Sequence, residues 1–188
     1  MSATGLPNLA PFSFFMAGGG SPLSVTISPL LNRAGLPKDT LTNISENGEY
    51  VINAVSFEMA SRMNVASADY PPDVSEWDRS GLTPAPSVRV GPARVAESPF
   101  ALECRLFTIV SHGSGFLAAN YIIGEIVAIH VAARLYDGDR IVPQRAELIA
   151  RMGGDWYARA DAASMFEMAR PAPAPARSEA GGESRTTA

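Results

Sequence analysis

Four segments rich in β-branched and aromatic residues most constrain what this chain can fold into. They span residues 24–28, 49–53, 101–110 and 122–131. Such runs favour strands, because branched and aromatic side chains pack well on a pleated surface. The segment 122–131 is apolar on both faces, which suits a central barrel strand or a strand covered by a partner subunit. The sequence therefore predicts a mainly β fold with short helices.

The segment 101–110 also shows an alternating pattern. Leu102, Cys104 and Leu106 fall on one face, and Glu103 and Arg105 fall on the other. This alternation is typical of an antiparallel strand with one buried and one solvated face. We expect Cys104 to be a buried, inert thiol.

A short helix is predicted after the first strand. Asp39 or Thr40 can cap its N-terminus, and Gly48 follows directly after Asn47, where a helix ending in a left-handed residue would stop. The remaining predictions are a helical segment over 56–65, a capping box over 73–76 that opens a helix ended by Gly81, and an extended Pro-rich surface connection over 84–99.

Bulk properties narrow the class of protein. The 188 residues suit one domain with a tail, and we assign 1–170 to the domain and 171–188 to a disordered Pro/Ala-rich tail. The net charge of −4 argues against a nucleic-acid partner. Polar residues interrupt the most apolar run, 116–135, which argues against a membrane span. One cysteine and no visible signal peptide fit a cytoplasmic protein.

Lys38 and Thr40 form a candidate anion site. A cation beside a helix N-terminus, where backbone N–H groups are free, favours a phosphate group. The alternative is a solvated loop lysine next to an ordinary helix cap, and these residues alone do not decide between the two.

The segment Asn8-Leu-Ala-Pro-Phe-Ser-Phe14 offers a second candidate site. Pro11 cannot donate to a sheet ladder, so nearby backbone donors are free to face a ligand, and Ser13 places a hydroxyl among phenylalanines. The alternative is a hydrophobic strand with one bulge caused by the proline.

Together these segments resemble the flavin reductase-like family. The resemblance runs in order through about residues 1–170. Besides the two segments above, it includes Glu49–Asn53, Met63–Ala68, Gly81–Ser87, Arg94–Pro99, Leu102–Cys104, Ile123–His130 and Gly153–Arg159.

The resemblance implies an FMN-binding split β-barrel, usually a homodimer, that takes hydride from NADH or NADPH. The reduced flavin would then serve an acceptor or a partner monooxygenase. By carry-over, the residues that would line the isoalloxazine are Asn8, Leu9, Ala10, Pro11, Phe12 and Ser13. Those on the phosphate side would be Ser28, Lys38, Asp39, Thr40 and Asn43. Those elsewhere near the flavin would be Asn64, Ser67, Tyr157 and Arg159, with His130 as a weaker catalytic candidate.

Similar proteins usually have a further N-terminal segment with a β-strand before the Asn8 motif. The resemblance therefore implies a barrel that lacks its usual first strand. Two alternatives to an enzyme stay open: a non-catalytic flavin carrier, and a degenerate barrel used as an interaction domain. No Gly-x-Gly-x-x-Gly fingerprint is present, so the nicotinamide would bind transiently. Two histidines without suitable neighbours do not predict a metal site.

Overall fold

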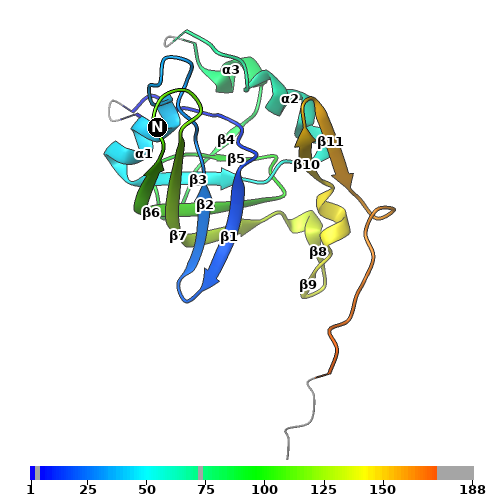
Figure 1. The fold of residues 1–188 in the computed structure, drawn as a ribbon. Helices are drawn as coiled ribbons and strands as arrows, with labels where there is room; N and C mark the ends of the chain where they lie inside the picture. The colour runs from blue at the N-terminus through cyan, green and yellow to red at the C-terminus, as the bar shows by residue number, and fades with distance from the viewer. Residues whose placement is uncertain (3–4, 72–73, 173–188) are drawn as a thin grey trace, which may run out of the picture.

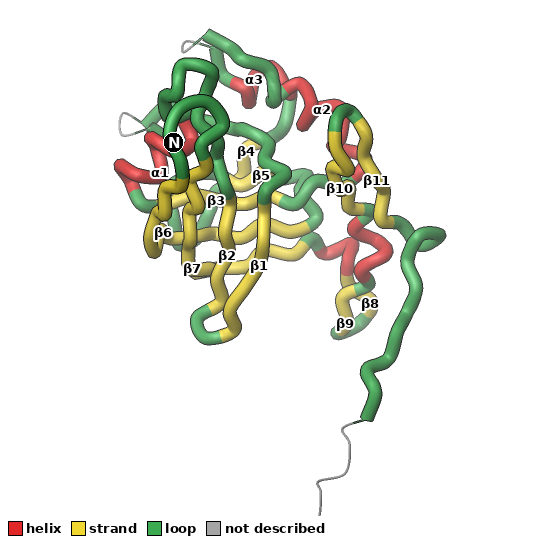
Figure 2. The backbone as a smooth tube through the Cα atoms, viewed as in Figure 1, coloured by secondary structure: helices red, strands yellow, loops and turns green. Residues whose placement is uncertain are grey.

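The centre of the molecule is a curved antiparallel sheet of five strands. The computed structural model describes residues 1–2, 5–71 and 74–172. The strand order is β1-β2-β7-β6-β3, and the sheet curls around the core with α1 at one end and the α2–α3 region above it (Figures 1 and 2). The strands are β1 (Phe15–Gly20), β2 (Leu23–Ile27), β3 (Glu49–Asn53), β6 (Phe100–His112) and β7 (Ala119–Val131).

All four predicted strands are confirmed. The segment 122–131, which is apolar on both faces, forms most of β7, and β7 lies between β2 and β6. A central position explains its composition, and the Ile122 side chain is fully buried. β1 was not predicted, because Gly18, Gly19 and Gly20 have low strand propensity. It forms because β2 supplies an antiparallel partner from Ile27 back to Leu23.

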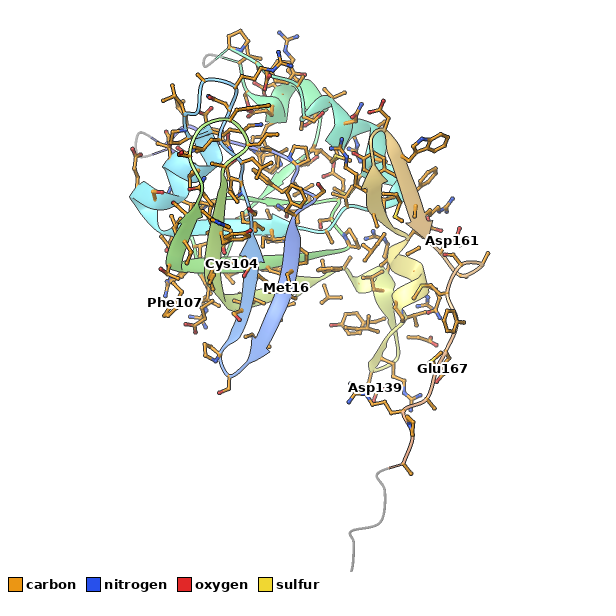
Figure 3. The ribbon with its side chains drawn as sticks, in the orientation of Figure 1. Met16, Cys104, Phe107, Asp139, Asp161 and Glu167 are labelled. Atoms are coloured by element: carbon orange, nitrogen blue, oxygen red, sulfur yellow. The ribbon has the colours of Figure 1, made fainter. Side chains whose placement is uncertain are left out.

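The main core fills the inside of the curved sheet. Its buried members are Val25, Ile27, Leu41, Ile44, Tyr50, Leu102, Cys104 and Ile122. As predicted, Cys104 is completely buried; Figure 3 labels it at the middle of the sheet. Burial, with the negative charge of Glu103 as a second cause, raises the pKa of the Cys104 thiol to about 12. The thiolate is therefore disfavoured, which agrees with an inert cysteine.

The first helix has the predicted extent. α1 (Asp39–Asn47) ends at Gly48, which adopts a left-handed conformation with φ of 70°. The predicted cap was wrong: Lys38 occupies the N-cap position, and no side chain in the described part of the chain caps the helix. Asp39 and Thr40 instead form the first turn, which leaves the Thr40 hydroxyl available for another contact.

Two short helical segments lie above the sheet. Residues 57–65 form a 3₁₀ turn, η1 (Phe57–Met59), followed by α2 (Ala60–Val65), close to the predicted helix. α3 (Glu76–Ser80) ends at Gly81 as predicted. The predicted capping box was wrong, because the helix begins at Glu76 with Ser75 as an uncapped N-cap; Asp73 lies outside the described residues.

The Pro-rich connection 84–99 lies partly at the surface, as predicted, but Val90, Val95, Ser98 and Pro99 are buried. It contains β4 (Pro84–Ala85) and β5 (Arg94–Val95), which pair as a small hairpin. Val95 is 2% exposed and joins a second core cluster with Met59, Trp77 and Leu82. This segment covers the face of β6 that was expected to be solvated. The Glu103 side chain is consequently fully buried.

The chain after β7 forms small elements at one side of the sheet (Figure 1). They are η2 (Ala133–Leu135), β8 (Tyr136–Asp137), β9 (Arg140–Ile141), η3 (Pro143–Ala146), β10 (Leu148–Gly153) and β11 (Trp156–Ala160). Strands β10 and β11 form a hairpin. Of the predicted tail, only Pro171 and Ala172 are described, and both are exposed without regular structure; residues 173–188 lie outside the described part.

Within the described ranges, no helix is long and apolar enough to cross a membrane. The same ranges contain no group of three or more His, Cys, Asp or Glu side chains that could hold a metal ion.

Candidate flavin site

The structure joins the two candidate segments that the sequence separates. The Asn8 amide Nδ2 donates a hydrogen bond to the Thr40 hydroxyl at 3.1 Å, across 32 positions of the chain. Thr40 is free to accept it because Lys38, rather than Thr40, occupies the helix cap. The Asn8 segment therefore begins at the N-terminus of α1, beside the candidate anion site.

Two further contacts fix the course of the segment 8–14. The Leu9 N–H points to the Glu76 carboxylate at 3.4 Å, and the Leu9 side chain packs against the second core cluster. At the other end, the Ser28 N–H donates to the Phe14 carbonyl at 3.1 Å. The segment thus passes from α1 to the start of β1, as Figure 1 shows in blue. Asn8, Leu9, Pro11 and Phe12 are half-buried, whereas Ala10 and Ser13 are exposed.

The N-terminus of α1 presents a cation and free donors. Lys38 and Asp39 are exposed, and the Lys38 carbonyl accepts the N–H groups of Leu41 and Thr42. Asn43 lies one turn further along the helix and is buried. An uncapped first turn beside a lysine is an arrangement that binds anions.

The other predicted residues fall into separate groups. Asn64 and Ser67 are exposed at the end of α2, where the Ser67 hydroxyl donates to the Asn64 carbonyl at 2.6 Å. Tyr157 is 43% exposed on β11. Among the described contacts, none directly links these three side chains to Asn8 or Lys38.

Arg159 has a structural role at the base of the β10–β11 hairpin. Its guanidinium pairs with Glu147 at 2.9 Å and with Asp161 at 3.5 Å. It also lies 4.3 Å from the ring centroid of Phe57. The Phe57 N–H in turn donates to the Glu147 carbonyl. These contacts tie the hairpin to the turn that precedes α2.

His130 lies at the opposite end of β7 from the predicted phosphate side. Ile27, next to Ser28, pairs with Ile122, whereas His130 pairs with Ala101. Eight residues of strand separate the two positions, roughly 26 Å. His130 Nε2 lies 2.5 Å from Glu103 Oε1.

Glu103 holds the imidazole and a loop at the same time. Its two carboxylate oxygens accept N–H groups from Val88 at 2.8 Å, Arg89 at 2.6 Å and Val90 at 3.2 Å. Burial alone would raise the pKa of Glu103. The donors from Val88, His130 and Arg89 outweigh it and hold that pKa below its usual range. Glu103 is thus an ionised hydrogen-bond acceptor. The sequence analysis did not predict this role, because the residues that bury Glu103 come from the separate segment 88–90.

A pocket of about 480 Å³ opens beside His130. Its lining includes Arg94, Ser98, Ala101, His130, Val131 and Tyr136. Arg94 and Tyr136 were not among the predicted site residues. No local signal marks them, because the pocket is assembled from β5, β6, β7 and the start of β8.

Comparison with known proteins identifies the class. Residues 1–143 match the model of the Flavin reductase like domain. An uncharacterized protein, BH2278, of Halalkalibacterium halodurans is 34% identical over 160 residues, covering 84% of this chain and 77% of that protein.

Two solved structures share the fold. Nitrilotriacetate monooxygenase component B from Bacillus cereus is 31% identical with a TM-score of 0.77, over 86% of this chain and 79% of that one. The 2-nitrobenzoate 2-nitroreductase NbaA of Pseudomonas fluorescens is 28% identical with a TM-score of 0.79, over 95% and 84%.

The fold and these neighbours define a flavin-related oxidoreductase built on a split barrel. The chain belongs to the flavin reductase-like domain family. This confirms the family resemblance and the predicted fold class, and it supports a flavin as the cofactor.

Proposed function

We propose that the protein binds FMN and passes electrons from NADH or NADPH through the flavin to an acceptor. The observation that carries the proposal is the hydrogen bond between Asn8 and Thr40, because it brings the segment expected to line the flavin ring to the anion site expected to hold its phosphate. Bound FMN would supply the hydride chemistry, and the protein would supply binding and orientation.

The residues at this site fit the chemistry of the cofactor. Lys38 and the open first turn of α1 would hold the phosphate. The half-buried Pro11 and Phe12 would provide an apolar wall for the ring, with Ser13 as a nearby polar group. Leu9, whose side chain packs against the second core cluster, would anchor this segment. Ser28, Asp39 and Asn43 lie next to these groups along the chain. We place Asn64, Ser67 and Tyr157 at the margin of the site.

We infer the candidate electron acceptors from the structural relatives of the chain. One structural relative is component B of a monooxygenase, and another is a nitroreductase. Release of reduced flavin to a partner monooxygenase and direct reduction of a small acceptor are therefore the two outcomes we propose to compare. We also propose that the protein is cytoplasmic and forms a homodimer.

The test is spectroscopic. The purified protein, reconstituted with FMN and freed of excess cofactor, should carry the visible absorption of oxidised flavin. That absorption should bleach on addition of NADH or NADPH under anaerobic conditions and return when an acceptor is added. Retention of flavin without bleaching would instead support a carrier, and failure to retain or bind FMN would support a degenerate barrel.

A further inference from the structure

The pocket beside His130 has features that the flavin site does not use. It is built from the ends of β6 and β7 and from the segments 94–98 and 132–136. It lies at the end of β7 opposite to Ser28. Its volume of about 480 Å³ falls in the range of small-molecule sites.

The electrostatics of the pocket favour an anion. Arg94 and His130 are the lining residues able to carry positive charge, and none of the described residues that line the pocket is an aspartate or a glutamate. Two acids that adjoin lining residues along the chain have basic partners: Glu97 pairs with Arg62 at 2.9 Å, and Asp137 pairs with Arg145 at 3.7 Å. Glu103 faces His130, but its carboxylate oxygens already accept hydrogen bonds from backbone N–H groups and from His130 Nε2.

The buried carboxylate also fixes how the imidazole is presented. An ionised carboxylate only accepts hydrogen bonds, so His130 Nε2 carries a proton and donates to Glu103. The remaining nitrogen, Nδ1, is not needed by Glu103, and the His130 side chain is 22% exposed where it lines the pocket. A neighbouring carboxylate is the usual means of holding an imidazole in one tautomer and orientation.

The rest of the lining suits an organic group. Ala101, Val131 and Ala132 provide apolar surface, and Tyr136 provides an aromatic ring. Arg94 is partly held in place, because its Nε donates to the Pro86 carbonyl at 3.1 Å, which leaves its terminal nitrogens available.

We propose that this pocket binds a small organic anion whose carboxylate or phosphate group lies between Arg94 and His130. It is a second ligand site, separate from the flavin site. Arg94 supplies a charge-assisted donor. His130 holds the anion as an imidazolium, in which Nε2 donates to Glu103 and Nδ1 donates to the anion. Glu103 acts through His130 as a positioning residue.

The two histidines allow a direct test. Ring nitrogen resonances of ¹⁵N-labelled full-length protein would be followed by NMR during titration with inorganic phosphate or benzoate, at constant ionic strength set with sodium chloride. His112 is exposed at the far end of β6 and serves as the internal control. The His130 resonances should move saturably, and those of His112 should not. Benzyl alcohol, which lacks the charge, should leave both unchanged.

Matched variants assign the site. Arg94→Gln should weaken binding about 10- to 100-fold, because it removes a charge-assisted hydrogen bond. Arg94→Lys should retain most of the affinity, and Arg79→Gln, an exposed arginine on α3, should retain all of it. Lys38→Ala should leave the His130 response intact, which separates this pocket from the flavin phosphate site. The relative affinities of phosphate and benzoate show which group the pocket selects.

Three results would overturn the proposal. One is the absence of a saturable His130 response to either anion. Another is an equal response of both histidines, which would indicate general ionic effects. The third is full affinity in a folded Arg94→Gln variant. Any of these would leave the Glu103–His130 pair as a purely structural clamp on residues 88–90, and none would affect the proposed flavin chemistry.

Discussion

Lys38 is the residue whose charge the flavin hypothesis uses most directly. Lys38 occupies the N-cap position of α1 and is exposed to solvent. The Lys38→Ala variant should bind FMN about 10- to 100-fold more weakly, since a charge-assisted hydrogen bond contributes roughly 1.5–3 kcal/mol. Riboflavin, which lacks the phosphate, should lose little affinity. Flavin fluorescence titrations measure both constants, with Arg79→Ala as the matched loss of an exposed cation. Equal losses for the two flavins would remove Lys38 from the phosphate site.

The side chain of Tyr50, a member of the main core, lies close against Gly124 of β7. A Cβ added at Gly124 would lie 2.1 Å from the Tyr50 hydroxyl oxygen and 3.0 Å from the Arg105 carbonyl. The buried hydroxyl has no hydrogen-bond partner among the described residues. Burial, followed by the charge of Cys104, raises the pKa of Tyr50, so the ring stays neutral.

This contact predicts a non-additive pair of substitutions. Gly124→Ala should lower the free energy of unfolding by about 1–3 kcal/mol through overpacking. Tyr50→Phe should change it by less than about 1 kcal/mol, because it deletes an unpaired polar group. The double variant should recover part of the loss, since the clash with the hydroxyl disappears while the ring carbon Cζ remains close. Urea denaturation measures all three, and costs that simply add would contradict the predicted contact.

At the scale of elements, Glu103 joins β6 to the loop 88–90 and to β7. Its pKa is lowered below the ordinary value of 4.5, so the folded state binds its proton less readily than the unfolded state does. The stabilisation is therefore fully present above the ordinary pKa and is lost as the pH falls through the lowered value. Glu97, held by Thr83 and Arg62, acts in the same direction.

Acid melting tests this arrangement. The melting temperature of the natural protein should fall as the pH is lowered from 7 to below 4.5. Glu103→Gln should be less stable at pH 7 by about 3 kcal/mol, because a neutral amide cannot accept all four donors. Its melting temperature should also depend less on pH. Glu58→Gln, an exposed control on η1, should behave as the natural protein. An unchanged pH profile in Glu103→Gln would mean that this carboxylate does not drive acid unfolding.

The sequence predicted the elements whose signal is local. Residues 49–53 and 101–110 form strands because their own side chains favour a pleated surface, and Gly48 ends α1 because a left-handed residue is needed there. The prediction that Glu103 lies on a solvated face was wrong, because residues 84–99 cover that face of β6. Alternation along one strand cannot reveal what a separate segment places over it.

The candidate site was predictable only in part, for the same reason. The resemblance to the flavin reductase-like family brought Asn8 and Thr40 into one hypothesis, but nothing in their spacing indicates a contact across 32 positions. Arg94 and Tyr136 went unnoticed because four elements must fold before their side chains share a pocket. Sites built from strand ends depend on topology more than on any motif.

At the scale of the whole molecule, the outer surface near β1 is incompletely covered. β1 is an edge strand of the five-stranded sheet. Phe14, Phe15 and Met16 are 60%, 45% and 61% exposed there, and Leu23 on β2 is 47% exposed. Figure 3 shows Met16 on β1 at the front of the sheet. An exposed edge with apolar side chains favours pairing with another chain.

We therefore expect a homodimer that covers β1. Light scattering at micromolar concentration should give about 40 kDa, twice the chain mass of 19.9 kDa. Met16→Glu should shift the protein to the monomer, because burying an unpaired carboxylate in an apolar interface is costly. Met168→Glu, at a similarly exposed methionine near the end of the described chain, should remain dimeric.

The alternative dimer interface is the surface around Phe107, which is 79% exposed on β6 and lies at the outer margin in Figure 3. Dissociation by Phe107→Glu and not by Met16→Glu would move the interface to that side of the sheet, and a natural protein that is monomeric at these concentrations would refute the dimer.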